Sequence, residues 1–322
     1  MRSHMVYRRF IAAVLFGMIL CAGGARGQAA ITTAPGPTTT PDDHQDASAA
    51  TKTIALWDGK APGALGDAEE DKPTITIYQP WSDHEPAPAV IVIPGGSYGH
   101  LATNHEGRQM ANWLNGAGIV AFVLKYRVGP KYHHPIELGD AQRAIRLVRA
   151  RSKEFFVLPN RIGILGFSAG GHLASTAETH FDGGDLQATD PIDRVSSRPD
   201  FAVLAYPVIS FIADYANKGS WENLLGRDAT PDMRRALSNE FNVTPATPPT
   251  FIFSSSTDDV VPPQNSIVFY LALEQAKVPA ELHIFQKAPH GVGLDLADPS
   301  VGEWSTLLLH WLRANKFLPN PN

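Results

Sequence analysis

Residues 161–170 read Arg-Ile-Gly-Ile-Leu-Gly-Phe-Ser-Ala-Gly, an apolar run that leads into the pattern G-x-S-x-G. Residues 171–177, Gly-His-Leu-Ala-Ser-Thr-Ala, continue as an expected helix. A sharp turn between a strand and a helix is typical of a nucleophile elbow, in which the serine Oγ stands clear of the sheet. Glycines are needed there because a side chain would collide with neighbouring backbone. The pattern predicts Ser168 as a nucleophile; the alternative is a glycine-rich turn with an incidental serine.

The C-terminal half of the chain supplies an acid and a base in the order that follows such a serine, first Asp or Glu and then His. The expected buried strand 250–255 ends just before Asp258 and Asp259, at the edge where open α/β sheets keep their sites. The expected strand 280–285 leads into a loop in which His290 is followed by glycine. We therefore predict His290 as the base and one of the two aspartates as the acid.

A glycine-rich loop, residues 94–99, follows the expected strand 89–93 and reads Pro-Gly-Gly-Ser-Tyr-Gly. An oxyanion hole in this arrangement uses the backbone N–H after the nucleophile and N–H groups of an earlier glycine loop. We predict Ala169 as the first donor and Gly96 and Ser97 as donors from the loop.

Two features of this loop leave alternatives open. It is similar to the His-Gly-Gly-Gly loop of esterases, with Pro94 in place of histidine and Ser97 in place of the last glycine. Turn geometry alone is the other explanation for its glycines. The aromatic Tyr98 lies beside the predicted acyl site, where it either lines a substrate-binding pocket or packs in the core.

The alternation of strands and helices predicts the fold class. Strands are expected near residues 74–78, 89–93, 119–124, 161–166, 201–206, 250–255 and 280–285. Helical patterns fall between most of them, as in residues 137–152, where apolar residues recur at i, i+3 and i+4. This order predicts an α/β fold with a doubly wound, mostly parallel sheet and helices on both faces. Arg143, Arg146 and Arg149 lie off the apolar stripe and are expected on a solvated helix face rather than in a polyanion site.

The N-terminus predicts where the protein works. Arginines precede the apolar run 10–22, and small residues follow it, so residues 1–27 read as a signal peptide. A lipoprotein signal at Cys21, the only cysteine, is the alternative. Cleavage removes four arginines and no acidic residue, which takes the net charge from −5 to −9. Such a chain is not expected to bind nucleic acid or, after cleavage, a membrane.

The rest of the chain divides into two parts. Residues 28–52 are rich in Thr, Pro, Ala and Asp, lack apolar periodicity and read as a disordered linker. Residues 53–322 are expected to form one catalytic domain. The sequence contains no phosphate-binding or dinucleotide fingerprint and no metal-ligand spacing with a matching third group, so we expect no cofactor and no metal.

Between about residues 55 and 315 the chain resembles the acetyl xylan esterase-like branch of the α/β-hydrolases, which includes bifunctional acetyl-xylan and feruloyl esterases. The matching runs are residues 94–98, 104–107, 123–127, 134–135, 140–146, 161–163, 166–174, 206–207, 223–226, 248–250 and 289–291. The resemblance implies an α/β-hydrolase fold and a catalytic triad of Ser168, Asp258 and His290. The family spacing Asp-x-x-Val-Pro selects Asp258 over Asp259. Ser97 departs from the glycine of many relatives.

The resemblance also implies the reaction. We expect a secreted or periplasmic serine esterase that removes acetyl groups from plant polysaccharide or from small esters. A broad-specificity short-chain carboxylesterase or a feruloyl esterase is the alternative. A serine peptidase, and a binding protein that has lost catalysis, are the competing classes.

Overall fold

The computed structural model describes residues 51–80 and 85–320. All of them belong to one unit, residues 47–322. The predicted signal peptide, residues 1–27, lies outside the described residues, and so does the predicted linker up to residue 50. The described residues therefore cover nearly all of the expected catalytic domain.

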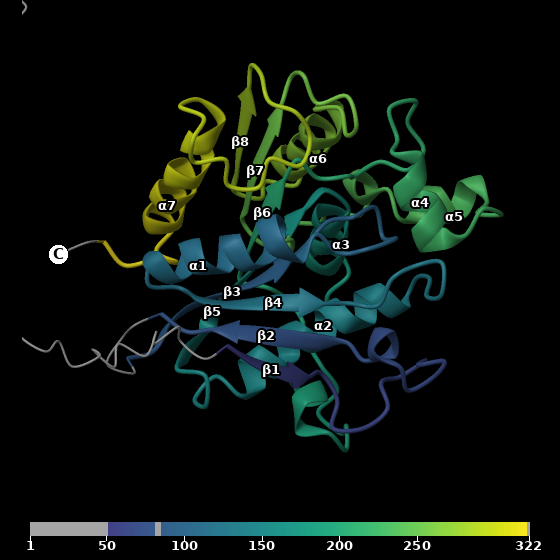
Figure 1. Cartoon of the computed structure of the whole chain (residues 1–322), viewed down its shortest axis with the longest axis vertical. Coiled ribbons are helices and arrows are strands. Elements are labelled where there is room, and N and C mark those ends of the chain that lie inside the picture. The colour runs from purple at the N-terminus through teal and green to yellow at the C-terminus, as the bar shows by residue number, and fades with distance from the viewer. Residues whose placement is uncertain (1–50, 81–84, 321–322) are drawn as a thin grey trace, which may run out of the picture. The chain divides into compact units, whose positions relative to one another are not determined.

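Eight strands form one sheet in the order β1-β2-β4-β3-β5-β6-β7-β8 (Figure 1). The strands are β1 Lys52–Ala55, β2 Thr74–Tyr78, β3 Ala87–Ile93, β4 Val120–Lys125, β5 Val157–Phe167, β6 Phe201–Ala205, β7 Thr250–Ser255 and β8 Ala280–Phe285. From β4 to β8 in this order all neighbours are parallel, whereas β2 is antiparallel to both β1 and β4. The predicted mostly parallel sheet is therefore confirmed.

Strand β1 is the one that the sequence does not reveal. Its four residues, Lys-Thr-Ile-Ala, are too few to show a period of two. The strand forms by pairing with β2, where Ile54 lies opposite Ile75. It begins at Lys52, the last residue of the predicted linker.

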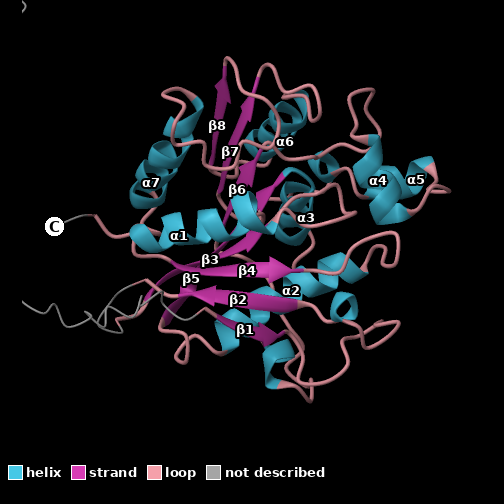
Figure 2. Ribbon diagram, in the orientation of Figure 1, coloured by secondary structure: helices cyan, strands magenta, loops and turns pink. Residues whose placement is uncertain are grey.

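Helices cover both faces of the sheet (Figure 2). They are α1 Gln109–Gly116, α2 Ile136–Ala150, α3 Ser168–Thr179, α4 Lys218–Leu225, α5 Pro231–Ala236, α6 Gln264–Gln275 and α7 Trp304–Ala314. Short helical turns are η1 Glu69–Asp71, η2 Thr103–Arg108, η3 Pro191–Arg194, η4 Asn239–Phe241 and η5 Val301–Glu303. Of these, η2 has π-helical hydrogen bonds. Helices α1 and α7 pack in one core cluster, and α2, α3 and α6 pack in the other.

The alternation of side chains along β3 explains why the sheet needs two layers of helices. Val90 and Val92 belong to the cluster with α1 and α7, whereas Ile91 and Ile93 belong to the cluster with α2, α3 and α6. All four are at most 1% exposed. Burying a side chain of this size stabilises the fold by about 1.5–3 kcal/mol, so both faces must be covered.

The three arginines of α2 contradict the expectation of a solvated helix face. Arg143 is only 3% exposed and binds Asp190 and Asp193 at 2.5 and 2.7 Å. The two other arginines of the set bind the same connection, Arg146 through Asp182 and Arg149 through Asp200. The expectation was wrong because the helix pattern does not show that the acidic segment 182–200 folds over this face.

Candidate active site

Ser168 lies at the turn between β5 and α3, as the elbow pattern predicts. Its φ is +53°, a left-handed conformation that a non-glycine residue seldom adopts. A Cβ at Gly166 would lie 2.2 Å from the carbonyl oxygen of Gly170, and one at Gly170 would lie 2.2 Å from that of Ile93. Only glycine fits at either position, so the G-x-S-x-G pattern follows from the packing of β3, β5 and α3 around the serine.

His290 contacts both of its predicted partners. Its Nε2 lies 2.8 Å from Ser168 Oγ, and its Nδ1 lies 2.7 Å from Asp258 Oδ2. With the ring proton on Nδ1, His290 donates to the carboxylate and accepts from the serine hydroxyl. The three side chains thus form one continuous chain of hydrogen bonds, although they lie on β5–α3, after β7 and after β8.

The other oxygen of Asp258 explains why this carboxylate faces the histidine. Asp258 Oδ1 accepts from the N–H of Val260 at 3.0 Å and of Val261 at 2.8 Å, and the residue is 4% exposed. These contacts place Oδ2 toward His290. Asp259, by contrast, is exposed. The structure therefore brings Asp258, and not its neighbour, to the histidine.

The glycine loop lies directly against the serine. A Cβ at Gly95 would be 2.9 Å from Ser168 Cβ. Gly96, Ser97 and Tyr98 all have positive φ, at +128°, +53° and +58°. Such a run of left-handed residues makes a tight turn, and backbone N–H groups left free in a turn can bind an anion.

Free backbone donors are present at the predicted positions. Within residues 51–80 and 85–320, the N–H groups of Gly96 and Ser97 meet no backbone acceptor. Ala169 is the second residue of α3, where a helical N–H has no partner within the helix. The N-terminal end of a helix also favours negative charge. The three groups can therefore donate to an oxygen that becomes negative above Ser168.

Tyr98 does not line a substrate pocket. Its side chain is fully buried, and its hydroxyl lies 2.8 Å from His172 Nδ1. His172 Nε2 lies 2.8 Å from the carbonyl of Leu237, and burial lowers the pKa of this histidine to about 3. The neutral ring thus donates to Leu237 and accepts from Tyr98. Of the two alternatives for Tyr98, the structure supports core packing, because the left-handed turn directs the ring inward.

Two groups at this edge of the sheet escaped sequence reasoning. Asn223 of α4 donates from Nδ2 to the carbonyl of Ser97 at 2.8 Å, which supports the glycine loop from outside. Glu106 of η2 accepts from the N–H of Gly95 at 2.8 Å. Asn223 is 126 residues from its partner, so no local spacing reveals it. Both residues lie in runs that carry the family resemblance, and that was the available signal.

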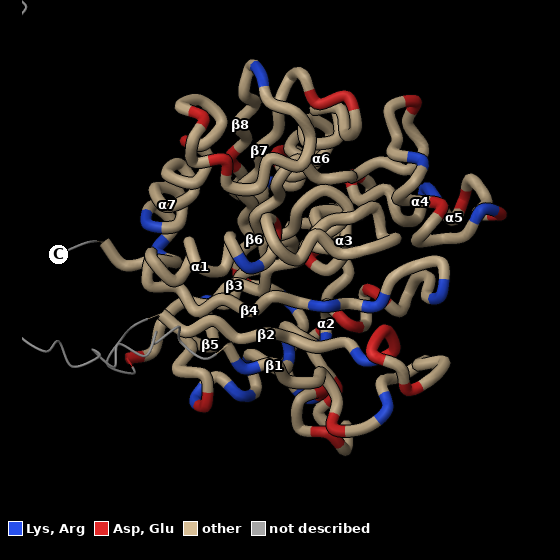
Figure 3. The backbone as a smooth tube through the Cα atoms, in the orientation of Figure 1, with Lys and Arg blue, Asp and Glu red and all other residues tan. Residues whose placement is uncertain are grey.

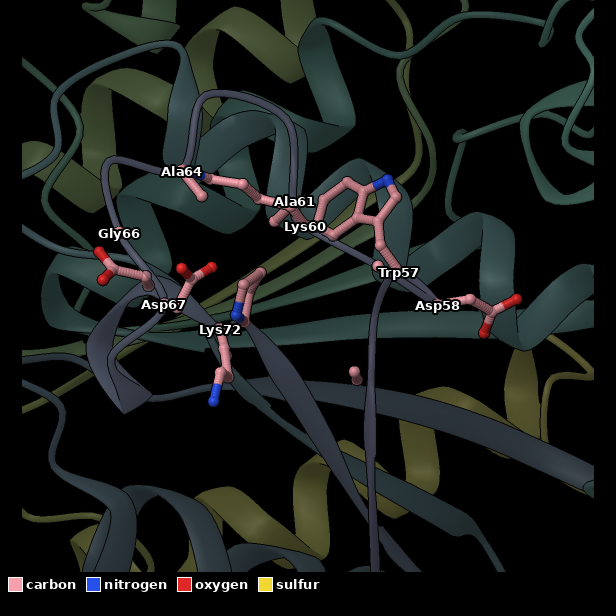
Figure 4. Close-up of a pocket in the computed structure, with 12 residues that line it drawn as sticks. Trp57, Asp58, Lys60, Ala61, Ala64, Gly66, Asp67 and Lys72 are labelled. Atoms are coloured by element: carbon pink, nitrogen blue, oxygen red, sulfur yellow. The ribbon is translucent and has the colours of Figure 1, made fainter.

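A cavity of about 250 Å³ lies apart from these residues (Figure 4). It is lined by residues between Ala55 and Pro73, with Trp57 on one side and Asp67 on the other. No residue of the Ser168 site lines it. In the part of the chain that the structure describes, no three His, Cys, Asp or Glu side chains are grouped to hold a metal ion.

Surface charge and hydropathy add two observations. Figure 3 shows Lys and Arg interspersed with Asp and Glu along the loops and helices around the sheet. None of the described helices combines the length and apolar character that a membrane crossing requires.

Known proteins resemble this chain in both sequence and structure. Acetylxylan esterase of Xylanibacter ruminicola is 34% identical over 235 residues, which are 71% of this chain and 45% of that protein. Endo-1,4-beta-xylanase B of Butyrivibrio fibrisolvens is 35% identical over 209 residues, 63% of this chain and 32% of that protein. The chain thus spans less than half of the length of these curated relatives.

One solved structure has a higher sequence identity to this chain than these two curated relatives. The acetyl ester-xyloside bifunctional hydrolase of Caldicellulosiruptor lactoaceticus superposes with a TM-score of 0.79 at 47% identity, and the match covers 83% of this chain and 97% of that one. The fold and these relatives define the class: the described domain is an α/β-hydrolase of the carboxylic ester hydrolase type. Within that class, residues 75–273 match the model of the BD-FAE family, and the chain belongs to that family.

Proposed function

We propose that the protein is a serine esterase that removes acetyl groups from plant polysaccharide by a triad of Ser168, His290 and Asp258. The observation that carries the proposal is the chain of hydrogen bonds from Ser168 Oγ through the imidazole to Asp258, at 2.8 and 2.7 Å. A serine hydroxyl is a weak nucleophile unless an adjacent base removes its proton. The left-handed φ of Ser168, +53°, is the strained geometry that is typical of a nucleophile elbow.

The mechanism assigns a step to each group. His290 takes the proton of Ser168 as Oγ attacks the ester carbonyl, and Asp258 stabilises the imidazolium that forms. The oxygen that becomes negative accepts hydrogen bonds from the N–H groups of Ala169, Gly96 and Ser97, which are fixed before the reaction. His290 then protonates the leaving sugar hydroxyl. Water attacks the acetyl-serine with the same base, and acetate and free serine result.

The substrate class rests on the relatives. One of them is an acetylxylan esterase, and the solved structure is described as an acetyl ester-xyloside bifunctional hydrolase. An exported enzyme with a cleaved signal, residues 1–27, and a linker, residues 28–52, would meet such a polymer outside the cytoplasm. The catalytic domain, residues 53–322, needs no cofactor for this chemistry.

Two measurements on purified protein test the proposal. The first is kcat/KM for aryl esters of increasing acyl length, with feruloylated sugars included, and the second is acetate release from acetylated xylan. We expect acetates to be cleaved much faster than octanoates and acetate to be released from the polymer. Preference for acyl chains of eight or more carbons, with no acetate from xylan, would leave the triad in place and move the protein to another esterase class.

A further inference from the structure

Glu106 is a buried carboxylate next to the proposed site that the mechanism above does not use. It lies on the π-helical turn η2 and is 3% exposed. Its Oε2 accepts from the N–H of Gly95 at 2.8 Å, and its Oε1 accepts from the hydroxyl of Tyr206 at 2.9 Å. Both partners are donors, so the position suits a carboxylate. An amide would turn its own N–H₂ toward one of them.

Tyr206 carries the connection to the other side of the site. It follows β6 and has a φ of +37°, which is unusual for a tyrosine. Its hydroxyl accepts from the N–H of Gly293 at 2.9 Å, and its ring lies edge-on to that of His290 with centroids 5.1 Å apart. Burial raises the pKa of Tyr206 well above its usual value, so the hydroxyl keeps the proton that it donates to Glu106.

These contacts link the two loops that must be placed against Ser168. One end of the link is Gly95, directly before the predicted oxyanion donors Gly96 and Ser97. The other end is Gly293, three residues after His290. A Cβ at Gly95 would lie 2.7 Å from the carbonyl of Phe167, so the loop touches the nucleophile turn and a small displacement changes its distance from the serine.

We propose that Glu106 is a positioning residue that fixes the glycine loop and, through Tyr206, the histidine loop in a common frame around Ser168. The inference rests on the proposed function, because it assumes that the N–H groups after Gly95 stabilise the oxyanion. Glu106 itself does not touch the substrate. It acts on the transition state, since the oxyanion forms only there, and it therefore affects kcat more than KM.

The test compares Glu106→Gln with a matched control, Glu178→Gln. Glu178 is also a fully buried carboxyl group, and it accepts from Thr250 Oγ1 at 2.8 Å. Thr250 is the first residue of β7, so this contact lies away from the site. With an aryl acetate, we expect Glu106→Gln to lower kcat by about 10- to 100-fold, because a displacement of about 1 Å has effects of this size. KM should change by less than about threefold. The control should keep wild-type kcat.

Tyr206→Phe keeps the Gly95 contact and removes only the second half of the link. It removes two hydrogen bonds, the one that Tyr206 donates to Glu106 and the one that it accepts from Gly293, and we expect it to lower kcat by about three- to tenfold. The double variant should be no worse than Glu106→Gln alone, because both changes interrupt the same connection. If Glu106→Gln does not fold, Tyr206→Phe alone decides between the outcomes.

Each outcome has a defined meaning. Wild-type kcat in folded Glu106→Gln, or in Tyr206→Phe, would overturn the positioning role. Equal losses in Glu106→Gln and Glu178→Gln that follow their melting temperatures would also overturn it, because any buried carboxyl would then have the same effect. A wild-type protein without ester turnover and without labelling by a fluorophosphonate would instead reject the proposed function.

Discussion

Asp258 and Glu137 are both buried carboxyl groups, at 4% and 0% exposure, but they differ in the hydrogen-bond donors around them. Near Ser168, Asp258 accepts from two backbone N–H groups and faces His290. In the first turn of α2, neither oxygen of Glu137 meets a hydrogen-bond partner on another of the described residues. Burial, the main cause, raises the pKa of Glu137 to about 8.

The comparison shows that burial alone does not determine what a carboxyl group does. Donors aimed at its oxygens favour the charged form, whereas burial without donors favours the neutral form. Asp140, one turn after Glu137, lies between these cases. Burial raises its pKa, and Arg127, which donates to it at 3.0 and 2.6 Å, acts in the opposite direction.

The largest expected effect is on the activity of variants at Ser168, which contacts Asp258 through His290. Ser168→Ala should lower kcat for an aryl acetate by on the order of 10⁵- to 10⁶-fold and leave the fold intact, because the residues of the proposed triad act as a unit. His290→Ala should cost about as much as the double variant. The measurement is steady-state turnover, with circular dichroism as the control for folding. Turnover within tenfold of wild type in uncontaminated Ser168→Ala would reject the mechanism.

The next effect separates Asp258 from its neighbour. Asp258→Asn should lower kcat/KM by about 10⁴-fold, because the amide cannot hold the histidine in the required tautomer. Asp259→Asn, on an exposed side chain, is the matched control and should change kcat/KM by less than about threefold. The opposite ranking would mean that the carboxylate seen beside His290 is not the one that supports catalysis.

In the α2 region the expected effect is on stability. Arg127→Met leaves Asp140 buried without its charge partner and should lower the free energy of unfolding by about 3–5 kcal/mol. The double variant Arg127→Met with Asp140→Asn removes the unpaired charge and should recover part of that loss. Denaturant unfolding measures both. A single variant as stable as wild type would show that this ion pair contributes nothing to the fold.

The smallest expected effect concerns Glu137 and has a defined sign. A pKa raised from 4.5 to about 8 means that the folded state binds the proton more tightly, so its contribution to stability is complete below pH 4.5 and is lost as the pH rises to about 8. The amide of Glu137→Gln does not titrate in this pH range. The variant should gain about 1–3 kcal/mol over wild type between pH 4.5 and 8. A stability difference that stays constant with pH would contradict a buried, neutral carboxyl at this position.

What could be predicted from the sequence depended on how far along the chain the contacts of each residue lie. The elbow, the glycine loop and the histidine loop follow from local patterns, since glycine at 166, for example, is required by a contact with Gly170 within one turn. The prediction that the arginines of α2 lie on a solvated face was wrong. Their partners lie in the segment 182–200, and the spacing of residues in the helix does not reveal that this segment packs there. For Tyr98 the sequence left two alternatives open. The residues around it do not show whether its ring points into the core or into a substrate pocket.

The sequence by itself determined the order of seven of the eight strands, the α/β class with a mostly parallel sheet, and Ser168 and His290 as the candidates for nucleophile and base. It did so because apolar periodicity and turn glycines act over a few residues. Only the tertiary structure placed Asp258 at 2.7 Å from the histidine, turned Tyr98 into the core and joined Glu106 to Tyr206. Those contacts join strands far apart in the chain, and their geometry depends on how the whole sheet packs between its two layers of helices.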